Sequence, residues 1–368
     1  MIPDAFHVER YRGFAARARV ELRPLTLIFG ANNSGKSALV RFLPLLAESV
    51  DARGSALRVD GDVTRRARFS DIANRALGPQ QLSFGFEWPD QNVEWTLRAE
   101  DRGARVDRLV SRGRVEFAED FDAPDPRIRG WVPPSEWIGR DLLPFREAVQ
   151  WMHGSRRSAE RYRDLPVSAP GLLAPDGSDA TDPLALDGDL DPINGFYQRL
   201  GLTLSVYHRN EQYGLAVASS ADPGTAIPLA DSGEGLAQVL PILVAIRQAG
   251  RGGAPVVAME QPELHLHTSA QRALAEHLCT AARAGEARLL VETHSEILLA
   301  AVQLSVVNGL VDPSRVAVYW TVRDEEGRTS VEPIEIRRDG RLEGAWPSRA
   351  FADLAELTRE VLRARRGA

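Results

Sequence analysis

The feature that most constrains this chain is a glycine-rich run of eight residues, G-A-N-N-S-G-K-S, at positions 30–37. It fits the pattern G-x-x-x-x-G-K-[ST], follows the apolar segment LTLIF and opens a helical stretch at 36–48. In such a unit the backbone N–H groups of the loop and the start of the helix point at one place, where anionic oxygens are most stable. The pattern therefore predicts a strand, a loop and a helix built around a phosphate group.

Lys36 inside this loop is the only lysine among 45 basic residues. Arginine serves at every other basic position, but a planar guanidinium is too wide for a phosphate loop, whereas a compact ammonium fits. We expect Lys36 to contact the terminal phosphates of ATP and the Ser37 hydroxyl to bind Mg²⁺. The ATP site is expected to include Asn32, Asn33, Ser34, Gly35, Lys36, Ser37 and Ala38.

The second half of the chain alternates between helical and extended patterns, which indicates a mostly parallel sheet. The expected order is helix 235–249, strand 255–260, helix 263–285, strand 287–294 and helix 295–309, then a hairpin at 316–336 and a helix at 350–365.

The first half is less regular. A hairpin followed by a strand is expected over 6–30, further strands at 82–88 and 93–98, and a long excursion at 164–195, which is dense in Pro, Gly and Asp. Pro44 should kink or end the helix at 36–48 near Leu43.

These patterns predict an α/β fold of the P-loop NTPase class, with a mixed or parallel sheet, an N-terminal antiparallel β part and an inserted middle region. The expected divisions are an N-terminal lobe with the phosphate loop at 1–99, the insertion at 100–225, a C-terminal lobe at 226–320 and a small hairpin and helix at 321–368.

The segment VVAMEQ at 256–261 is a buried strand that delivers two polar side chains at its carboxyl end, as in a Walker B motif. Glu260 is the predicted magnesium residue. Gln261 occupies the position where a glutamate normally polarises the attacking water. Because a carboxamide cannot accept a proton, hydrolysis should be slow, or another base such as Glu263 must serve.

A second apolar strand, LLVETH, ends in His294. A neutral imidazole there can hydrogen-bond the γ-phosphate or the attacking water and so sense hydrolysis. His265 and His267 have no partner ligands at suitable spacing, so no metal other than Mg²⁺ is expected.

The run DSGEG at 231–235 precedes a helix and offers a second anion-binding helix start. It makes sense if it contacts the nucleotide of a neighbouring subunit. An ordinary glycine-rich helix entry, capped by Ser232, is the alternative.

Composition and charge indicate where the protein is located and which partners it can have. The net charge is −6, the single cysteine cannot form an internal disulfide, and no apolar run approaches the roughly 18 residues of a membrane span, so a cytoplasmic location with no membrane contact is expected. DNA binding is not indicated by charge and would need local patches. One such patch is formed by Arg65, Arg66 and Arg68, and another by Arg156, Arg157, Arg161 and Arg163.

With phosphate loop, signature, Walker B strand and switch histidine in this order, the chain resembles the ABC-type ATPases of the SMC, RecF and OLD branch. RYRGF resembles the opening strand of that branch. EQPELHLH and the ending AWPSRAFADL are similar to bacterial stand-alone AAA ATPases with a small C-terminal domain of unknown function. OLD-type relatives carry a Toprim nuclease, but no D-x-D follows Leu298, so none is expected in this polypeptide.

The resemblance implies an ABC-ATPase-like head with Arg12 near the nucleotide. It also implies a head-to-tail homodimer, in which the signature of one protomer closes on the ATP held by Lys36 of the other. The signature residues are Ser232, Gly233, Glu234 and Gly235. In this branch a glutamine helps to hold magnesium. By their order along the sequence, Gln80 and Gln81 are candidates for that position, and Asp71 is an equal candidate.

The implied function is a slow ATPase that acts as an ATP-gated switch for a separate effector, such as a nuclease or toxin, or for a DNA transaction. Relatives of this kind suggest bacterial anti-phage defence. A non-hydrolysing ATP-dependent scaffold is the alternative, motivated by Gln261. A transporter subunit is disfavoured, because it would carry LSGGQ and an Asp-Glu pair where this chain has DSGEG and Glu-Gln.

Overall fold

The computed structural model describes residues 2–50, 52, 54–78, 80–101, 103–113, 117–120 and 127–344. Within these ranges the strands form three sheets. The N-terminal sheet is antiparallel, in the order β2-β1-β4-β5-β6-β7, with β1 Ala5–Glu9, β2 Ala18–Glu21, β4 Gln81–Trp88, β5 Gln91–Glu100, β6 Gly103–Gly113 and β7 Phe117–Asp120. The central sheet has the order β17-β16-β15-β3-β14-β13-β8, with β3 Leu25–Gly30, β8 Val149–Met152, β13 Val256–Glu260, β14 Arg288–Glu292, β15 Val316–Arg323, β16 Thr329–Ile336 and β17 Leu342–Gly344. A small sheet contains β10 Leu202–Arg209, β11 Gln212–Ser219 and β12 Asp222–Pro228, with β9 Arg163–Asp164 paired to β11.

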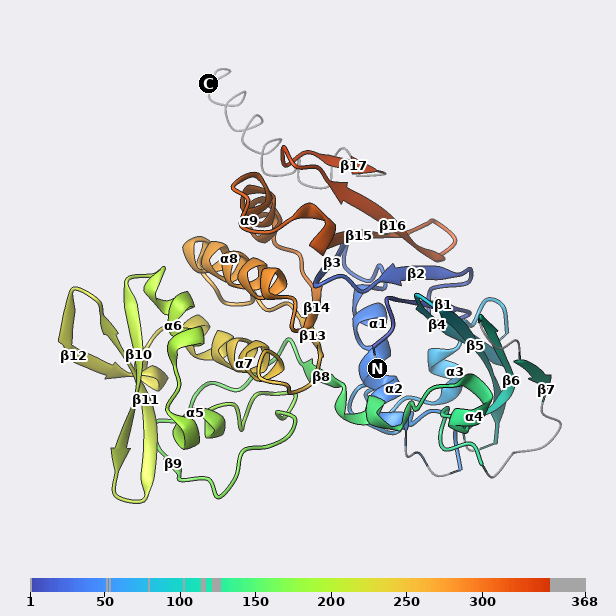
Figure 1. Cartoon of the computed structure of the whole chain (residues 1–368), viewed down its shortest axis with the longest axis horizontal. Coiled ribbons are helices and arrows are strands. Elements are labelled where there is room, and N and C mark those ends of the chain that lie inside the picture. The colour runs from blue at the N-terminus through green and yellow to red at the C-terminus, as the bar shows by residue number, and fades with distance from the viewer. Residues whose placement is uncertain are drawn as a thin grey trace, which may run out of the picture.

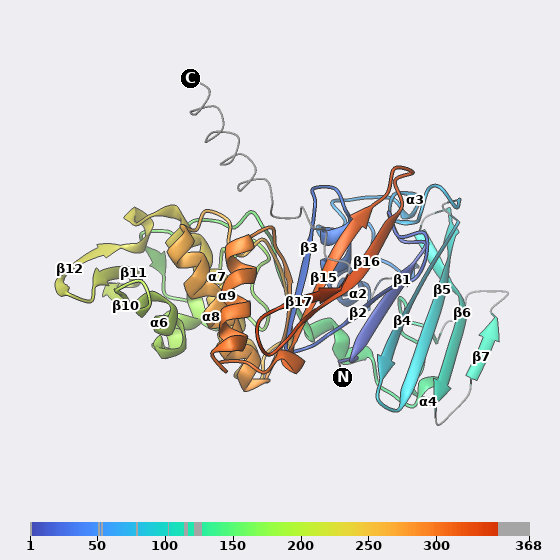
Figure 2. The same ribbon diagram turned by 90° about the horizontal axis from the view of Figure 1, so that it is seen from above.

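Helices separate and cover these sheets. The helices are α1 Lys36–Val40, α2 Phe42–Ser49, α3 Phe69–Ile72, α4 Ser135–Ile138, α5 Asp182–Asp187, α6 Asp191–Gln198, α7 Glu234–Ala249, α8 Thr268–Ala284 and α9 Glu296–Val307, with 3₁₀ turns at Leu143–Glu147, Leu229–Asp231 and Pro313–Arg315. Helices α1 and α2 lie between the central and N-terminal sheets, and α7, α8 and α9 lie on the other side of the central sheet (Figures 1 and 2). The small sheet lies beyond α6 and α7 at one end of the molecule.

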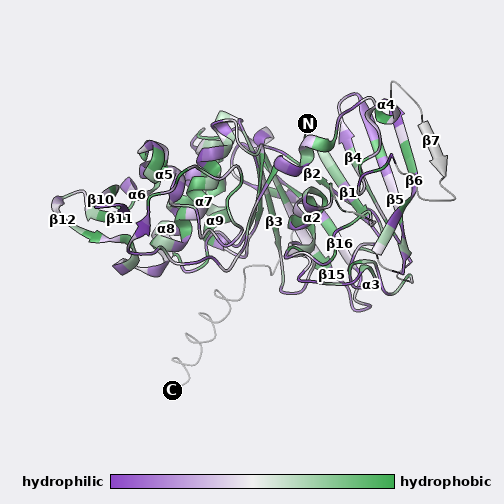
Figure 3. Ribbon diagram, turned by 90° about the horizontal axis from the view of Figure 1, so that it is seen from below, coloured by the Kyte–Doolittle hydropathy of each residue, from purple (hydrophilic) through white to green (hydrophobic). Residues whose placement is uncertain are grey.

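Strand β3 shows why the central sheet needs helices on both faces. Leu25, Leu27 and Phe29 point into the core formed with α7, α8 and α9, whereas Ile28 points into the core formed with α2 and the N-terminal sheet. A strand buried on both faces is a continuous apolar run, as LTLIF is. Figure 3 shows this hydrophobic strand in the middle of the molecule.

The alternation of strands and helices expected in the second half is confirmed, as are the hairpin at 316–336 and the strands around 82–98. The expected start of the helix at 263 is wrong, because α8 begins at Thr268. The long excursion contains the short helices α5 and α6. The helix expected at 350–365 lies outside the described residues.

The break in the helix after the phosphate loop comes earlier than expected, at Arg41 rather than near Leu43. Proline has no N–H to donate, so Pro44 cannot bond the carbonyl four residues before it, that of Val40. Helix α1 therefore ends at Val40, and Pro44 lies in the first turn of α2, where a missing N–H costs little.

The predicted α/β architecture, with a mixed central sheet and an antiparallel N-terminal sheet, is confirmed. The division of the chain at 99, 225 and 320 stays a prediction. Strand β8, from within 100–225, pairs with β13 in the central sheet. None of the helices in the described ranges has the length and apolar character that crossing a membrane requires.

An aromatic cluster under the N-terminal sheet gives a test of this core. Phe84 is fully buried and stacks on Trp95 with ring centroids 4.9 Å apart. We expect Phe84→Ala to lower the free energy of unfolding by about 3–5 kcal/mol, because the change removes packed ring atoms and leaves a cavity. Urea unfolding measures this, with Leu77→Ala as the control because Leu77 is 48% exposed. If Phe84→Ala and Leu77→Ala lowered the free energy of unfolding equally, the placement of Phe84 in this core would be contradicted.

Candidate nucleotide-binding site

The loop at 31–35 is shaped by its glycines and held from behind by β15. Gly35 has φ of 95°, and a side chain on Gly30 would place its Cβ 2.1 Å from Thr321 Oγ1. Thr321 Oγ1 lies 2.5 Å from Ser34 Oγ and donates a hydrogen bond to the carbonyl of Phe29 at 3.0 Å. The loop is therefore fixed by contacts within the protein.

Lys36 is buried at the first position of α1. Its ammonium donates hydrogen bonds to the carbonyls of Gly30 at 3.0 Å and Ala31 at 2.7 Å. Burial lowers the pKa of Lys36, and the nearby Glu292 carboxylate opposes that shift. Within the described residues no carboxylate lies within the 4.0 Å of an ion pair with Lys36. A phosphate group can thus replace the two carbonyls as its partner.

Next to Lys36, Ser37 is joined to a carboxylate that the sequence analysis missed. The Ser37 hydroxyl donates to Glu292 Oε1 at 2.8 Å. Glu292 is buried at the end of β14, and its Oε2 has no hydrogen-bond partner in the described part of the chain. Burial raises the pKa of Glu292. The available signal was a charged residue at the end of an apolar strand, two positions before the histidine already singled out.

Glu260, the predicted magnesium residue, is engaged elsewhere. Arg41 donates to both of its carboxylate oxygens, at 2.7 and 2.6 Å, and the indole N–H of Trp151 donates to Oε1 at 2.9 Å. All three side chains are buried. Strand β14 lies between β3 and β13, so Glu260 is two strands away from the phosphate loop and Glu292 is one. Neither Arg41 nor Trp151 carries a sequence pattern that would link it to Glu260.

Gln261 and His294 follow the ends of β13 and β14. Gln261 has φ of 43°, and its backbone N–H donates to the carbonyl of Glu292 at 2.8 Å. Partial burial and the Lys36 ammonium lower the pKa of His294, so its imidazole is neutral at pH 7. This is the protonation state that the sequence analysis expected for hydrogen bonding to a phosphate or a water.

Glu263, the predicted substitute base, lies behind this edge. Its Oε1 accepts hydrogen bonds from the Thr293 hydroxyl at 2.6 Å and the His294 backbone N–H at 3.0 Å. Burial raises the pKa of Glu263. The contacts hold the turn that carries His294, and this geometry fits a positioning residue better than a base.

Arg156 ties this turn to α7. Its guanidinium donates to the carbonyl of Gln238 on α7 at 2.7 Å and to those of Glu260 and Gln261 at 3.2 and 3.4 Å. Burial lowers the pKa of Arg156 to about 10, so it stays charged at neutral pH. A shift of α7 is thereby coupled to the backbone that presents Gln261.

A cavity of about 750 Å³ opens in front of the loop. Ten residues expected at the site line it, namely Arg12, Asn32, Asn33, Ser34, Gly35, Lys36, Ser37, Ala38, Gln261 and His294. Glu260 and Glu263 are not among its lining residues. Additional walls come from Arg41, Glu292 and the turn between β15 and β16, which the sequence analysis did not assign to the site. Of the candidates for the magnesium-holding glutamine position, Asp71 lines the cavity and Gln80 and Gln81 do not.

The signature residues lie at the start of α7 and do not line this cavity. Ser232 donates its hydroxyl to the carbonyl of Leu229 at 2.6 Å, Gly233 and Glu234 are exposed, and Gly235 is buried. Their contact with a partner's nucleotide stays a prediction.

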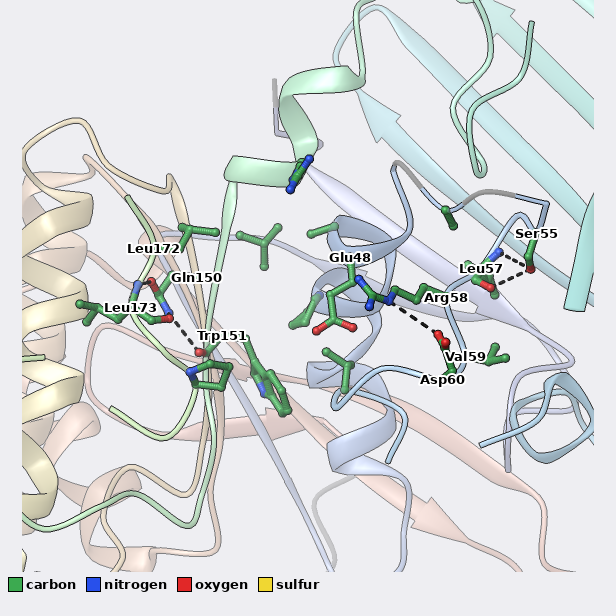
Figure 4. A pocket seen from close by; sticks show the side chains of 17 residues that line it. Glu48, Ser55, Leu57, Arg58, Val59, Asp60, Gln150, Trp151, Leu172 and Leu173 are labelled. Carbon is green, nitrogen blue, oxygen red and sulfur yellow. Dashed lines mark hydrogen bonds and ion pairs between the residues drawn. The ribbon is translucent and has the colours of Figure 1, made fainter. Parts of the chain in front are cut away.

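A second cavity, of about 640 Å³, lies between α2, the 52–63 segment and β8. Figure 4 shows Glu48 and Trp151 in its wall, with the ion pair between Arg58 and Asp60 on one side. Trp151 lines this cavity while its indole N–H reaches Glu260. Arg41, the other partner of Glu260, lines the first cavity. Glu260 is therefore hydrogen-bonded to one residue from the wall of each cavity.

With this geometry, comparison with known proteins identifies the family. Residues 25–300 match the family described as "AAA domain, putative AbiEii toxin, Type IV TA system". The chain belongs to this AAA family. The match contains the phosphate loop, α7 and the ends of β13 and β14.

Two kinds of similar protein were found beside the family match. The OLD nuclease of Thermus scotoductus is 26% identical over 321 residues, which is 75% of this chain and 56% of that protein. The chain thus spans about half the length of this curated relative. The SMC head bound to the C-winged helix domain of ScpA has a TM-score of 0.53 at 10% identity, covering 91% of this chain and 99% of that one. The SMC head domain from Thermotoga maritima has a TM-score of 0.45 at 12% identity, covering 91% of this chain and 100% of that one.

The expected membership in the AAA, SMC and OLD branch of P-loop ATPases is confirmed by the family match and the OLD nuclease relative. The SMC-head likeness shows the fold, an α/β P-loop NTPase head. Proteins of this AAA branch are generally ATPases that bind a nucleotide.

The ion pair between Arg41 and Glu260 gives a test of the site's internal electrostatics. We expect Arg41→Ala to lower the free energy of unfolding by about 3–5 kcal/mol, because it leaves a buried carboxylate without its cation. The double variant Arg41→Met with Glu260→Gln should recover most of this loss, because no charge is then buried.

Urea unfolding of the full chain measures both variants. The control is Arg75→Ala, which removes a solvent-exposed pair with Asp71 and should change stability little. The account of this pair is contradicted if Arg41→Ala behaves like Arg75→Ala.

Proposed function

We propose that this chain binds ATP with Mg²⁺ at the phosphate loop, hydrolyses it slowly and acts as an ATP-gated switch. The observation that carries the proposal is the buried Lys36 ammonium, whose hydrogen-bond partners among the described residues are two loop carbonyls, beside a cavity of about 750 Å³. A buried cation with no carboxylate partner is stabilised by an anionic ligand. The backbone N–H groups at the start of α1 add further donors for phosphate oxygens.

The donor set also fits a magnesium ion held together with the phosphates. Mg²⁺ is usually bound through one or two protein oxygens plus substrate phosphates, and the Ser37 hydroxyl is one such oxygen beside the loop. When bound, the ion would neutralise charge that develops on the phosphate oxygens. Within the described residues no cluster of three His, Cys, Asp or Glu side chains forms a separate metal site.

Slow hydrolysis follows from the groups that face the cavity. Gln261 can orient a water molecule through its carboxamide but cannot take its proton. The neutral imidazole of His294 can hydrogen-bond the γ-phosphate or that water. Glu263 is turned toward the His294 turn and does not line the cavity, so neither Gln261 nor Glu263 is placed to take the proton of the attacking water.

Two copies would complete the switch by closing on ATP, with the start of α7 of one copy over the phosphate loop of the other. The exposure of Gly233 and Glu234 allows this contact. Arg156 would transmit a movement of α7 to Gln261, because its guanidinium donates hydrogen bonds to the carbonyls of Gln238 on α7 and of Gln261. Closure would therefore be sensed at the residues that orient water.

The output of the switch would be a separate effector, a nuclease or a toxin, in a cytoplasmic anti-phage defence system. The support is the similarity to an OLD nuclease and to an SMC head that binds a ScpA domain. DNA is a weaker candidate, because the arginines at 156–163 named above already have partners within the protein. Arg156 is buried, and Arg157, Arg161 and Arg163 pair with Asp176, Asp231 and Asp182.

A non-hydrolysing ATP-dependent scaffold is the second candidate, favoured by Gln261 and by the orientation of Glu263. A transporter subunit is not supported, because the chain keeps DSGEG and Glu-Gln in place of the motifs such a subunit would carry.

Steady-state phosphate release from purified protein separates the two candidates. We expect slow release by the wild type, release on the order of 10²-fold faster by Gln261→Glu because it adds a general base, and none by Lys36→Ala. If the wild type and Gln261→Glu release phosphate no faster than Lys36→Ala, the slow ATPase is ruled out and the scaffold remains.

Light scattering with ATPγS and Mg²⁺ tests the dimer. The wild type should change from monomer to dimer on adding the nucleotide, and Glu234→Arg should bind the nucleotide but stay monomeric, because it inserts a bulky cation at the predicted contact. Glu211→Arg, the same charge change at an exposed turn beside the small sheet, is the matched control. Dimerisation of Glu234→Arg to the same extent as Glu211→Arg would rule out the α7 interface.

A further inference from the structure

The turn that joins β15 to β16, residues 323–329, forms one wall of the nucleotide cavity. We propose that this turn is the nucleoside end of the nucleotide site, and that the guanidinium of Arg323 stacks on the base. The proposal rests on the proposed ATP binding and concerns the same site. It assigns a part of the cavity wall that the phosphate loop and the histidine turn do not account for.

The strand order gives the cavity two ends. Strand β15 lies on one side of β3 and β14 on the other (Figure 1). The β14 side of the cavity carries Glu292 and His294, and His294 is expected at the terminal phosphate. On the β15 side, Thr321 is level with Gly30 at the start of the phosphate loop. A nucleotide whose γ-phosphate lies at the β14 side therefore extends its sugar and base toward the turn that follows β15.

Contacts with two loops hold the turn at the cavity. The guanidinium of Arg323 donates a hydrogen bond to the carbonyl of Asn33 in the phosphate loop at 3.4 Å. The backbone N–H of Thr329 donates to the carbonyl of Gly13 at 2.8 Å. Gly13 follows Arg12, and both line the cavity. The turn and the loop that contains Arg12 thus form a continuous wall beside the phosphate loop.

Arg323 differs from its neighbour Arg328 in its partners. Arg328 forms ion pairs with Asp324 and Glu326 at 2.7 and 2.9 Å. Among the described residues no carboxylate lies within the 4.0 Å of an ion pair with Arg323, whose partners there are two backbone carbonyls. The Arg323 side chain is also exposed. Its planar group is available to lie against a base, which a guanidinium attracts by stacking and by its charge.

The charge of the turn favours a nucleoside over another phosphate. Residues 323–329 contain two arginines and three acidic residues, Asp324, Glu325 and Glu326, so their net charge is −1. Carboxylates repel a phosphate, but they accept hydrogen bonds from a ribose hydroxyl or a base amino group. Glu326 lines the cavity. The phosphates therefore fit at Lys36, and the uncharged end of the nucleotide fits at the turn.

Calorimetric titration of the full chain with ATPγS and with ADP, both in Mg²⁺, tests the assignment. We expect Arg323→Ala to weaken the binding of both nucleotides about tenfold and by the same factor, because ADP keeps the nucleoside. Arg323→Phe should bind both nearly as tightly as the wild type, because a phenyl ring stacks on a base. Phenylalanine has no charge and no N–H, so it cannot bind a phosphate or hold the carbonyl of Asn33.

Arg337→Ala is the matched control, because it removes another exposed arginine from the same hairpin. Arg337 follows β16, forms ion pairs with Glu335 and Glu343, and does not line the nucleotide cavity. Its affinity for both nucleotides should equal that of the wild type.

The outcomes separate this proposal from the proposed function. If the wild type binds neither nucleotide, both fail. If the wild type binds and Arg323→Ala binds as tightly, or no more weakly than Arg337→Ala, only the assignment of the turn fails. A loss for ATPγS without a loss for ADP would place Arg323 at the γ-phosphate. Equal losses in Arg323→Ala and Arg323→Phe would show that Arg323 acts through its charge or its hydrogen bonds, and either result overturns the stacking on the base.

Discussion

The parallel register of β3, β14 and β13 is the constraint on which the site depends. It brings three strand ends to one edge of the central sheet, with Ile28, Glu292 and Glu260 at the same level. The phosphate loop leaves the first strand, the histidine turn the second and Gln261 the third. The groups at these three strand ends are therefore placed by backbone hydrogen bonds between buried strands, which are among the stiffest parts of a protein.

Among the buried cations at this edge, Arg41 and Lys36 have different partners. Arg41 is neutralised by Glu260, and this pair is completed by Trp151 from the wall of the second cavity. In the part of the chain that the structure describes, the hydrogen-bond partners of Lys36 are loop carbonyls. The difference explains why one cation is part of the framework and the other is available to an anionic ligand. The hydrogen bonds from Arg41 and Trp151 to Glu260 also connect the walls of the first and second cavities.

The sequence was sufficient for features that depend on neighbouring residues. The phosphate loop, the buried strands and α7 follow from local patterns, and ten of the predicted site residues line one cavity. It was insufficient where partners lie far apart in the chain. Ser37 and Glu292 are 255 positions apart, and Arg41 and Glu260 are 219 apart. The strand order, which puts β14 between β3 and β13, is a property of the whole sheet, so the sequence pattern alone could not show that Glu292 contacts Ser37.

The central claim is that the loop around Lys36 binds a nucleoside triphosphate. Isothermal titration calorimetry of the full chain with ATPγS and Mg²⁺ tests it most directly. The account predicts a saturable heat of binding with one nucleotide per chain, and no such heat for Lys36→Ala. The absence of measurable binding heat in the wild type at several temperatures, or equal binding by Lys36→Ala, would contradict it.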